Sequence, residues 1–397
     1  MSLHPNNEAL RHSLVTSPLV AGRYENLELI NWDPTTGQKR GCFSLVFKAY
    51  DKVDAKNVAL KFYDLDPRWT ADIYRRQAFT REHEILQILL NTDRCLQLAS
   101  ALETYTIDFP SPSGGSITVS CQYFAVDWIE DSIDHYFLNQ QHIDAIEKLE
   151  LFNEIVASVE ALHRHEVFHR DLKADNLRAY QKALKKIVIA IDLGTAARHS
   201  SPHLQTTYQH SVGAPAYASI EALSGLAGHR TLAPKTDVYA LGCLLFELFN
   251  FDYFYRKLHD LNKNYGLVQY AMASFLNGAT TEQQQLSAWK LAISKFSKSF
   301  IPIEIDSAGS SAPKGIAPIL NDCLNLLTNI DCFKRPSDLS VIRSKIRSAI
   351  TCLKNERAYQ TRLQTQRDIR RQKRENALIK VARLAAVLDR NSINVRR

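Results

Sequence analysis

The chain has 397 residues, of which 45% are hydrophobic and 23% charged, a composition typical of a globular protein. A chain of this length can bury a core without disulfide or metal cross-links, and it predicts roughly two domains or lobes. Its seven cysteines are scattered and form no C-x-x-C pair, which argues against a zinc or disulfide framework and favours a reducing, cytoplasmic location. We expect no transmembrane segment and no secretory signal, because no long apolar run is present.

The formal net charge of +7 is concentrated at the carboxyl end. From residue 354 onward the chain carries thirteen Lys and Arg against four Asp and Glu, so the remainder is slightly acidic. Residues 355–388 contain no Gly or Pro and predict a helix. Residues 351–397 are therefore predicted to form a basic helical tail, which could bind an acidic partner or nucleic acid. A charged helix that packs on, or projects from, the preceding domain is the plainer interpretation.

The amino-terminal part favours strands. Residues 1–22 are polar with scattered Leu and Pro, and predict a flexible lead-in. Residues 43–47 and 58–62 have the pattern of strands with buried faces, whereas residues 71–90 change to a helical period.

The chain becomes mainly helical after residue 131. Apolar residues mark one face of a helix around 149–162, and the nearly continuous apolar run 238–249 predicts a helix buried all round. Strands followed by helices predict an α+β protein of two lobes. The domain predicted over residues 23–350 would have an N-lobe at 23–128 and a C-lobe at 129–350.

A polar cluster lies between a predicted helix and a predicted strand, in Val167–Leu177 (VFHRDLKADNL). The segment resembles the catalytic loop of eukaryotic-type (Hanks-type) protein kinases, in their serine/threonine-specific form. The matching positions are His169, Arg170, Asp171, Lys173 and Asn176.

The resemblance implies a bilobal protein-kinase-like fold and a role for each matching residue. Asp171 would receive the substrate proton, Lys173 would offset phosphoryl charge, and Asn176 would help to bind Mg²⁺. A second segment, Asp192-Leu193-Gly194, follows a strand-like run in the place of the metal-binding DFG motif. Asp192 is therefore the second expected metal ligand, since Mg²⁺ prefers oxygen ligands.

The N-lobe supplies the expected nucleotide contacts. Lys61, in Val58–Lys61, resembles the strand lysine that contacts ATP phosphates, and Glu82 resembles its helix partner, with Glu84 as the competing candidate. The glycine-rich pattern over the phosphates falls on Lys39–Val46, where only the middle glycine is retained. The remaining residues expected to contact ATP are Lys39, Gly41, Phe43, Val46, Ala59 and, in the hinge between lobes, Val126, Asp127 and Ile129.

The remaining matches are structural or regulatory. Ala214 stands where these kinases usually carry a threonine that bonds to the catalytic Asp and Lys. Arg170 matches kinases whose activation segment is ordered by its own phosphate, with Thr207 and Ser211 as candidate phosphorylation sites. A buried ion pair is expected between Glu221 and Arg335, and Asp237 is expected to brace the catalytic loop.

These matches predict a protein serine/threonine kinase that uses ATP and Mg²⁺ on a protein substrate, including its own chain. The main alternative is a pseudokinase that serves as a binding or scaffold module, favoured by the degraded glycine loop and by Ala214. A small-molecule kinase is a second alternative, but such enzymes generally lack the pair formed here by Glu221 and Arg335.

Overall fold

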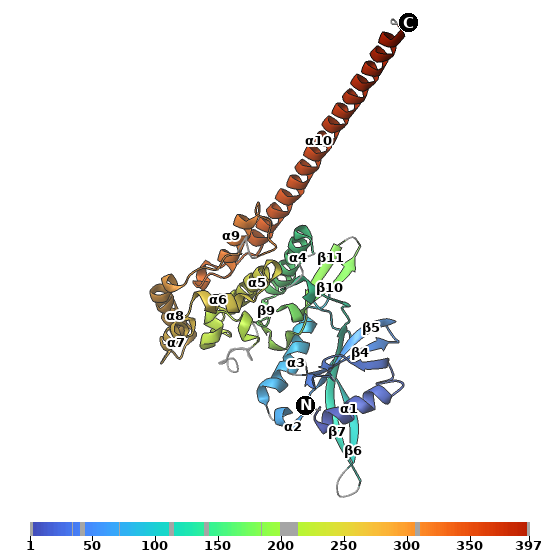
Figure 1. The fold of residues 1–397 in the computed structure, drawn as a ribbon. Coiled ribbons are helices and arrows are strands. Elements are labelled where there is room, and N and C mark those ends of the chain that lie inside the picture. Colours follow the sequence, from blue (N-terminus) through green and yellow to red (C-terminus); the bar gives the residue numbers. More distant parts are fainter. Residues whose placement is uncertain are drawn as a thin grey trace.

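The computed structural model describes residues 3–33, 35–39, 44–70, 72–110, 115–138, 143–183, 185–198, 213–305 and 310–394, with side chains of the last helix described as far as residue 376. These residues form a small lobe built on a β-sheet and a larger, mainly helical lobe, from which one long helix projects (Figure 1). The predicted α+β, two-lobe class is confirmed.

The small lobe contains a five-stranded antiparallel sheet. In spatial order its strands are β1 (Tyr24–Leu29), β4 (Ser44–Asp51), β5 (Lys56–Tyr63), β7 (Ser116–Asp127) and β6 (Glu103–Pro110). The expected alternation buries Phe47 on β4 against Phe62 on β5, edge to face, with 5.7 Å between ring centroids. Other small-lobe elements are β2 (Trp32–Asp33), β3 (Gln38–Lys39), α2 (Pro67–Thr70) and α3 (Ile73–Ile88).

The amino terminus differs from the flexible lead-in expected over residues 1–22. Helix α1 (Pro5–Thr16) packs against β1 and β6, and its Leu10 and Leu14 are fully buried in the cluster that contains Phe47. A spacing of four residues places these two leucines on one helix face, which is enough to seat a short helix on an existing sheet.

The large lobe is organised around α5 (Ala233–Phe249), which is buried on nearly all sides, as its continuous apolar run predicts. Its neighbours include α4 (Ala145–Arg164), α6 (Phe254–Leu261) and α9 (Ala317–Leu327). Two further helices are α7 (Tyr265–Ser274) and α8 (Glu282–Phe296). Short strands frame the site: β8 (Asp131–Ser132), β9 (Val167–Phe168), β10 (Leu177–Lys182), β11 (Lys185–Ala190) and β12 (Ala197–Arg198).

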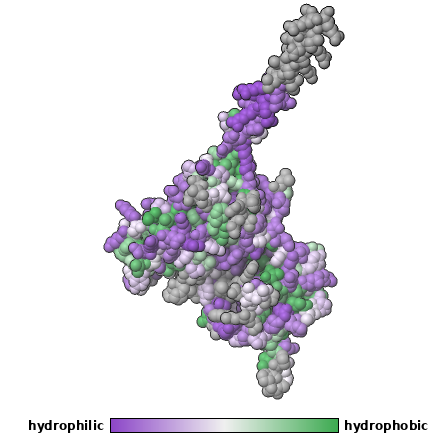
Figure 2. Space-filling model, in the orientation of Figure 1, coloured by the Kyte–Doolittle hydropathy of each residue, from purple (hydrophilic) through white to green (hydrophobic). Residues whose placement is uncertain are grey.

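The final helix, α10 (Ser340–Asn394), has 55 residues and crosses the boundary predicted between residues 350 and 351. Its first turns bury Ile342, Ile346 and Leu353 in the large-lobe core, beside α4 and α9. From residue 354 to 376 its side chains are exposed or half-buried, and the projecting part is strongly hydrophilic (Figure 2). The helix is therefore part of the domain core as far as Leu353. Lys354 and Arg357 still form ion pairs with Glu150 and Asp144 at the start of α4, and the side chains described after them, to residue 376, are exposed or half-buried.

Candidate active site

The segment between β9 and β10 is held from below by Asp237 on α5. The Asp237 carboxylate accepts hydrogen bonds from the backbone N–H groups of His169 and Arg170, both at 2.7 Å. Its Oδ2 atom also lies 2.9 Å from Nε2 of His163, and Asp237 is 1% exposed. Burial alone would raise the pKa of Asp237, but the hydrogen bond and charge of His163 hold it below its usual value. Asp237 thus fixes the backbone that carries Asp171.

Asp171 is oriented through both carboxylate oxygens. Oδ1 accepts the backbone N–H of Ala214 at 2.6 Å, and Oδ2 accepts Nδ2 of Asn176 at 3.0 Å. Burial raises the pKa of Asp171, although the charge of Lys173 opposes this shift. A raised pKa makes a carboxylate a better proton acceptor near neutral pH, so the placement suits general base chemistry.

Lys61 joins the two lobes. Its Nζ atom lies 2.5 Å from Oε1 of Glu82 on α3 and 3.3 Å from Oδ1 of Asp192. Glu82 also accepts the backbone N–H of Leu193 at 3.0 Å. The competing candidate, Glu84, is exposed on the other side of the helix. The structure therefore brings Lys61, Glu82 and Asp192 together as one buried polar cluster.

The charge state of this cluster suits phosphate and metal binding. Burial alone would lower the pKa of Lys61, but the charges of Glu82 and Asp192 raise it. Burial likewise opposes ionisation of Asp192, yet the charges of Lys61 and His169 hold its pKa below the usual value. Lys61 is thus kept positively charged and Asp192 negatively charged where the two lobes meet.

Asp192 and Asn176 are the candidate ligands for a divalent metal ion. The backbone of Ile191, directly before Asp192, donates to the carbonyl oxygen of Asn176 at 2.8 Å, which places the two segments side by side. Among the described residues no group of three or more His, Cys, Asp and Glu could hold a metal alone. Mg²⁺ commonly combines one or two protein ligands with waters and substrate phosphates, so this sparse oxygen set is compatible with it.

The residues expected around adenine meet on the sheet. Ala59 on β5 pairs in register with Val126 on β7, and both are buried. Val46 on β4 pairs in register with Lys61. The Asp127 N–H donates to the Gln97 carbonyl oxygen at 3.0 Å, and Ile129 is half-buried. The predicted hydrogen bonds from the backbone of these two residues to adenine stay predictions.

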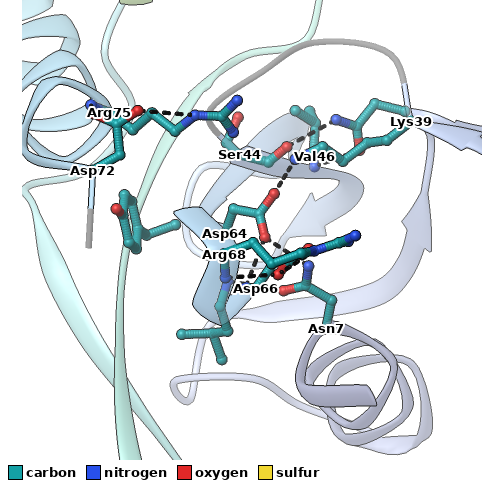
Figure 3. Close-up of polar contacts among 12 residues, drawn as sticks. Asn7, Lys39, Ser44, Val46, Asp64, Asp66, Arg68, Asp72 and Arg75 are labelled. Atoms are coloured by element: carbon teal, nitrogen blue, oxygen red, sulfur yellow. Dashed lines mark hydrogen bonds and ion pairs between the residues drawn. The ribbon is translucent and has the colours of Figure 1, made fainter. Parts of the chain in front are cut away.

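The phosphate-covering segment is described only at its ends. Gly41 and Phe43 lie outside the described residues, so their predicted contacts stay predictions. Lys39, at the end of β3, forms an ion pair with Asp64, just beyond β5 (Figure 3). Nothing in the sequence indicated this partner for Lys39.

Arg170 links the catalytic loop to the segment after Asp192. Its Nε atom donates to the carbonyl oxygen of Thr195 at 2.8 Å, and burial lowers the pKa of the guanidinium to about 10. The two predicted phosphorylation sites, Thr207 and Ser211, lie outside the described residues.

Glu221 and Arg335 form a fully buried ion pair, with Arg335 Nη2 3.2 Å from Glu221 Oε2. Arg335 also donates to the carbonyl oxygens of Asn329, at 2.8 Å, and Lys235, at 2.9 Å. These bonds satisfy the buried guanidinium, as a buried charge requires.

The comparisons with known proteins agree with this geometry. The protein kinase domain family matches residues 37–345, more than three quarters of the chain. This chain belongs to that family. The predicted Hanks-type serine/threonine kinase resemblance is thus confirmed.

Relatives of this kinase domain include bacterial and plant proteins. "Serine/threonine-protein kinase PknD" of Chlamydia muridarum is 27% identical over 258 residues, which cover 59% of this chain and 25% of that protein. "Serine/threonine protein kinase OSK3" of Oryza sativa subsp. indica is 29% identical over 230 residues, which cover 57% of this chain and 39% of that protein. The chain spans well under half the length of these relatives.

Two features of the kinase domain were missed from the sequence. Gly213 has φ +84°, and a Cβ there would lie 2.4 Å from the Arg170 carbonyl oxygen and 2.9 Å from Asp171 Oδ1. Asp64 was missed because a lone Asp after a strand carries no motif. The positive φ could not be found, but the Gly-Ala dipeptide at 213–214 was a visible signal for a close approach.

Proposed function

We propose that this chain is a protein serine/threonine kinase that transfers the γ-phosphoryl group of ATP, with Mg²⁺, to a hydroxyl group on a protein. Two observations together carry the proposal. Lys61 contacts both Glu82 and Asp192, and each carboxylate oxygen of Asp171 accepts a hydrogen bond. A domain used only for binding would not need its carboxylate fixed through both oxygens.

Each residue has a role that follows from its contacts. Lys61, held by Glu82, binds the α- and β-phosphates, and Asp171 accepts the proton of the attacking hydroxyl. Lys173 offsets negative charge on the transferred group. Asn176 and Asp192 would hold Mg²⁺, which supplies further neutralisation of phosphate charge.

Phosphate transfer from labelled ATP to the chain itself and to a generic protein acceptor tests the proposal. Asp171→Ala and Asp192→Asn should each abolish labelling, whereas Asp322→Asn, at an exposed ion pair far from the site in sequence, should not. Wild-type protein that binds MgATP but transfers nothing would support the pseudokinase alternative instead. Free amino sugars or choline, offered as acceptors, test the small-molecule alternative.

We also propose that phosphorylation of Thr207 or Ser211 orders the activation segment through Arg170. The support is the place of Arg170, whose Nε donates to the carbonyl oxygen of Thr195 at 2.8 Å, in the segment that leads to these two residues. A phosphate carries about two negative charges, which an arginine can bind. Phosphosite mapping before and after incubation with MgATP tests this, with Thr207→Ala and Ser211→Ala as the variants.

The basic face of α10 is proposed to bind an anionic partner, with nucleic acid as the first candidate. Four exposed arginines repeat at i, i+3, i+4 and i+7 and so share one helix face: Arg367, Arg370, Arg371 and Arg374. Binding to a labelled DNA duplex should weaken with salt and with reversal of these four charges. Reversal of Arg357 and Arg362, two other exposed arginines of α10, is the control.

We propose a cytoplasmic location. All six cysteines in the described part of the chain are free, which fits a reducing compartment. Within those same residues, no helix is long and apolar enough to cross a lipid bilayer.

A further inference from the structure

Helix α1 is tied to the residues that follow β5 by one buried amide. Asn7, which is 3% exposed, donates from Nδ2 to Asp64 Oδ1 at 2.6 Å. Its Oδ1 atom accepts the backbone N–H of Leu65 at 2.8 Å. Because both ends of the amide are used, Asn7 helps to fix the direction in which the Asp64 carboxylate points.

Asp64 in turn connects α1 to Lys39. Its Oδ2 atom forms an ion pair with Lys39 Nζ, and Figure 3 shows Asn7 and Lys39 approaching the same carboxylate from two different elements. The Asp64 side chain is 5% exposed and that of Lys39 17%. Burial alone would raise the pKa of Asp64, but the charge of Lys39 and the hydrogen bonds from Lys39 and Asn7 lower it. Oδ1 of Asp64 also accepts the backbone N–H of Asp66 at 3.0 Å. The carboxylate is therefore charged and held by three groups, of which Asn7 is the one that comes from α1.

This chain of contacts ends at Lys39, the residue at which the predicted phosphate-covering segment begins. Lys39 is the last described residue before the glycine-poor segment that the sequence places over the phosphates. Asp64 follows the strand that carries Lys61, and Lys61 pairs in register with Val46 on β4. Lys39 is thus tied to the residue directly after β5, the strand that carries the lysine proposed to bind phosphate.

We infer that Asn7 is a positioning residue for nucleotide binding: through Asp64 it fixes Lys39, and α1 thereby sets the affinity of the domain for MgATP. The inference rests on the proposed kinase function. Lys39 contributes through its placement rather than as a free cation, because Asp64 already balances its charge. No contact between Asn7 and the nucleotide is required.

The test is a double-mutant cycle on the full chain with Asn7→Ala, Lys39→Gln and the double variant. Each single variant should raise the Kd and KM for MgATP by about three- to tenfold, the effect of one lost buried hydrogen bond or ion pair, with kcat changed less than about twofold. The double variant should have the same Kd and KM for MgATP as Lys39→Gln alone, because both substitutions interrupt the same series of contacts from Asn7 through Asp64 to Lys39.

Asn6→Ala is the matched control. Asn6 lies next to Asn7 on α1 and donates to the Leu65 carbonyl oxygen at 3.2 Å, and its amide is not bonded to Asp64. An Asn7→Ala protein with the MgATP affinity of Asn6→Ala would overturn the inference. So would a double variant whose increase in Kd is the product of the two single-variant increases.

If Asn7→Ala does not fold, Asp64→Asn must give the same loss of MgATP affinity, and wild-type affinity in Asp64→Asn overturns the inference. Wild-type protein that neither binds nor transfers ATP would overturn the proposed function, and this inference with it.

Discussion

Asp171 accepts a hydrogen bond from the backbone N–H of Ala214 at 2.6 Å, although the two residues lie 43 positions apart in the chain. The contact is possible because Gly213 lets the backbone pass within van der Waals distance of the catalytic loop. The threonine expected at position 214 is absent, so the main chain here makes a bond to the catalytic carboxylate that does not depend on a side chain.

Gly213→Ala should therefore reduce catalysis more than stability. The added Cβ would push against the Arg170 carbonyl oxygen and Asp171, and displacement of a catalytic group by about 1 Å can cost about a hundredfold in rate. We expect kcat to fall by about ten- to a hundredfold, measured as steady-state transfer to a generic acceptor.

Gly278→Ala is the control for backbone strain. Gly278 has φ +81°, close to that of Gly213, but a Cβ there meets nothing within 4 Å. Both variants should lose similar thermal stability, while only Gly213→Ala loses activity. Equal activity in the two variants would show that the Ala214–Asp171 contact does not matter for transfer.

Glu82→Gln should lower kcat/KM for ATP, whereas Glu84→Gln should not. The first change removes the charge that holds Lys61 at 2.5 Å, so the lysine is free to leave its phosphate-binding position. The second changes an exposed side chain on the same helix. We expect about a ten- to hundredfold loss for Glu82→Gln, measured by initial rates over a range of ATP concentrations. The reverse order of effects would assign the lysine partner to Glu84.

The sequence indicated which residues lie together in the proposed active site, because the proposed chemistry requires fixed residue types at fixed local spacing. Glu82 could be preferred over Glu84 because it stands one helical turn before Leu86, as the family pattern requires. Residues two positions apart on a helix point about 200° apart, so the two glutamates could not both face Lys61. The Asn7–Asp64–Lys39 link could not be predicted. It joins three segments that no period or motif relates, and its residues would be solvated turn or loop residues in most chains.

The ends of the domain were also hard to predict, for a physical reason. Helix α10 continues without a break through residue 350, and only burial changes, between Leu353 and the exposed residues that follow. A helical pattern in the sequence predicts the local backbone conformation, but it does not predict the residue at which the helix stops packing against the domain. At the other end, two leucines one turn apart gave too weak a stripe to predict that α1 packs on the sheet.

The Glu221–Arg335 pair should be essential for folding. Glu221→Gln leaves a fully buried guanidinium without its counter-charge, which typically costs about 3–5 kcal/mol. Urea denaturation should show this loss. Asp322→Asn, which breaks the partly exposed pair with Lys345, should cost only about 0–1 kcal/mol. Similar midpoints for the two variants would mean that the buried pair is dispensable.

Glu247 should make the stability of the large lobe depend on pH. Burial raises the pKa of Glu247 from 4.5 to about 7, even though the side chain accepts the Tyr217 hydroxyl at 2.7 Å. Between these two values the folded protein keeps a proton that the unfolded chain has released. The stabilising contribution is thus complete below pH 4.5 and is lost as the pH rises to about 7.

Glu247→Gln imitates the protonated side chain at every pH and should remove this dependence. We expect the free energy of unfolding of the wild type to fall relative to the variant by up to about 3 kcal/mol between pH 5 and pH 8, measured by urea denaturation. Glu150→Gln, on the exposed surface of α4, should keep the wild-type profile. A constant difference between wild type and Glu247→Gln across this range would mean that Glu247 is ionised in the folded protein throughout. In that case Tyr217 would be held to α5 by a charged acceptor, and the bond between them would not weaken on acidification to pH 5.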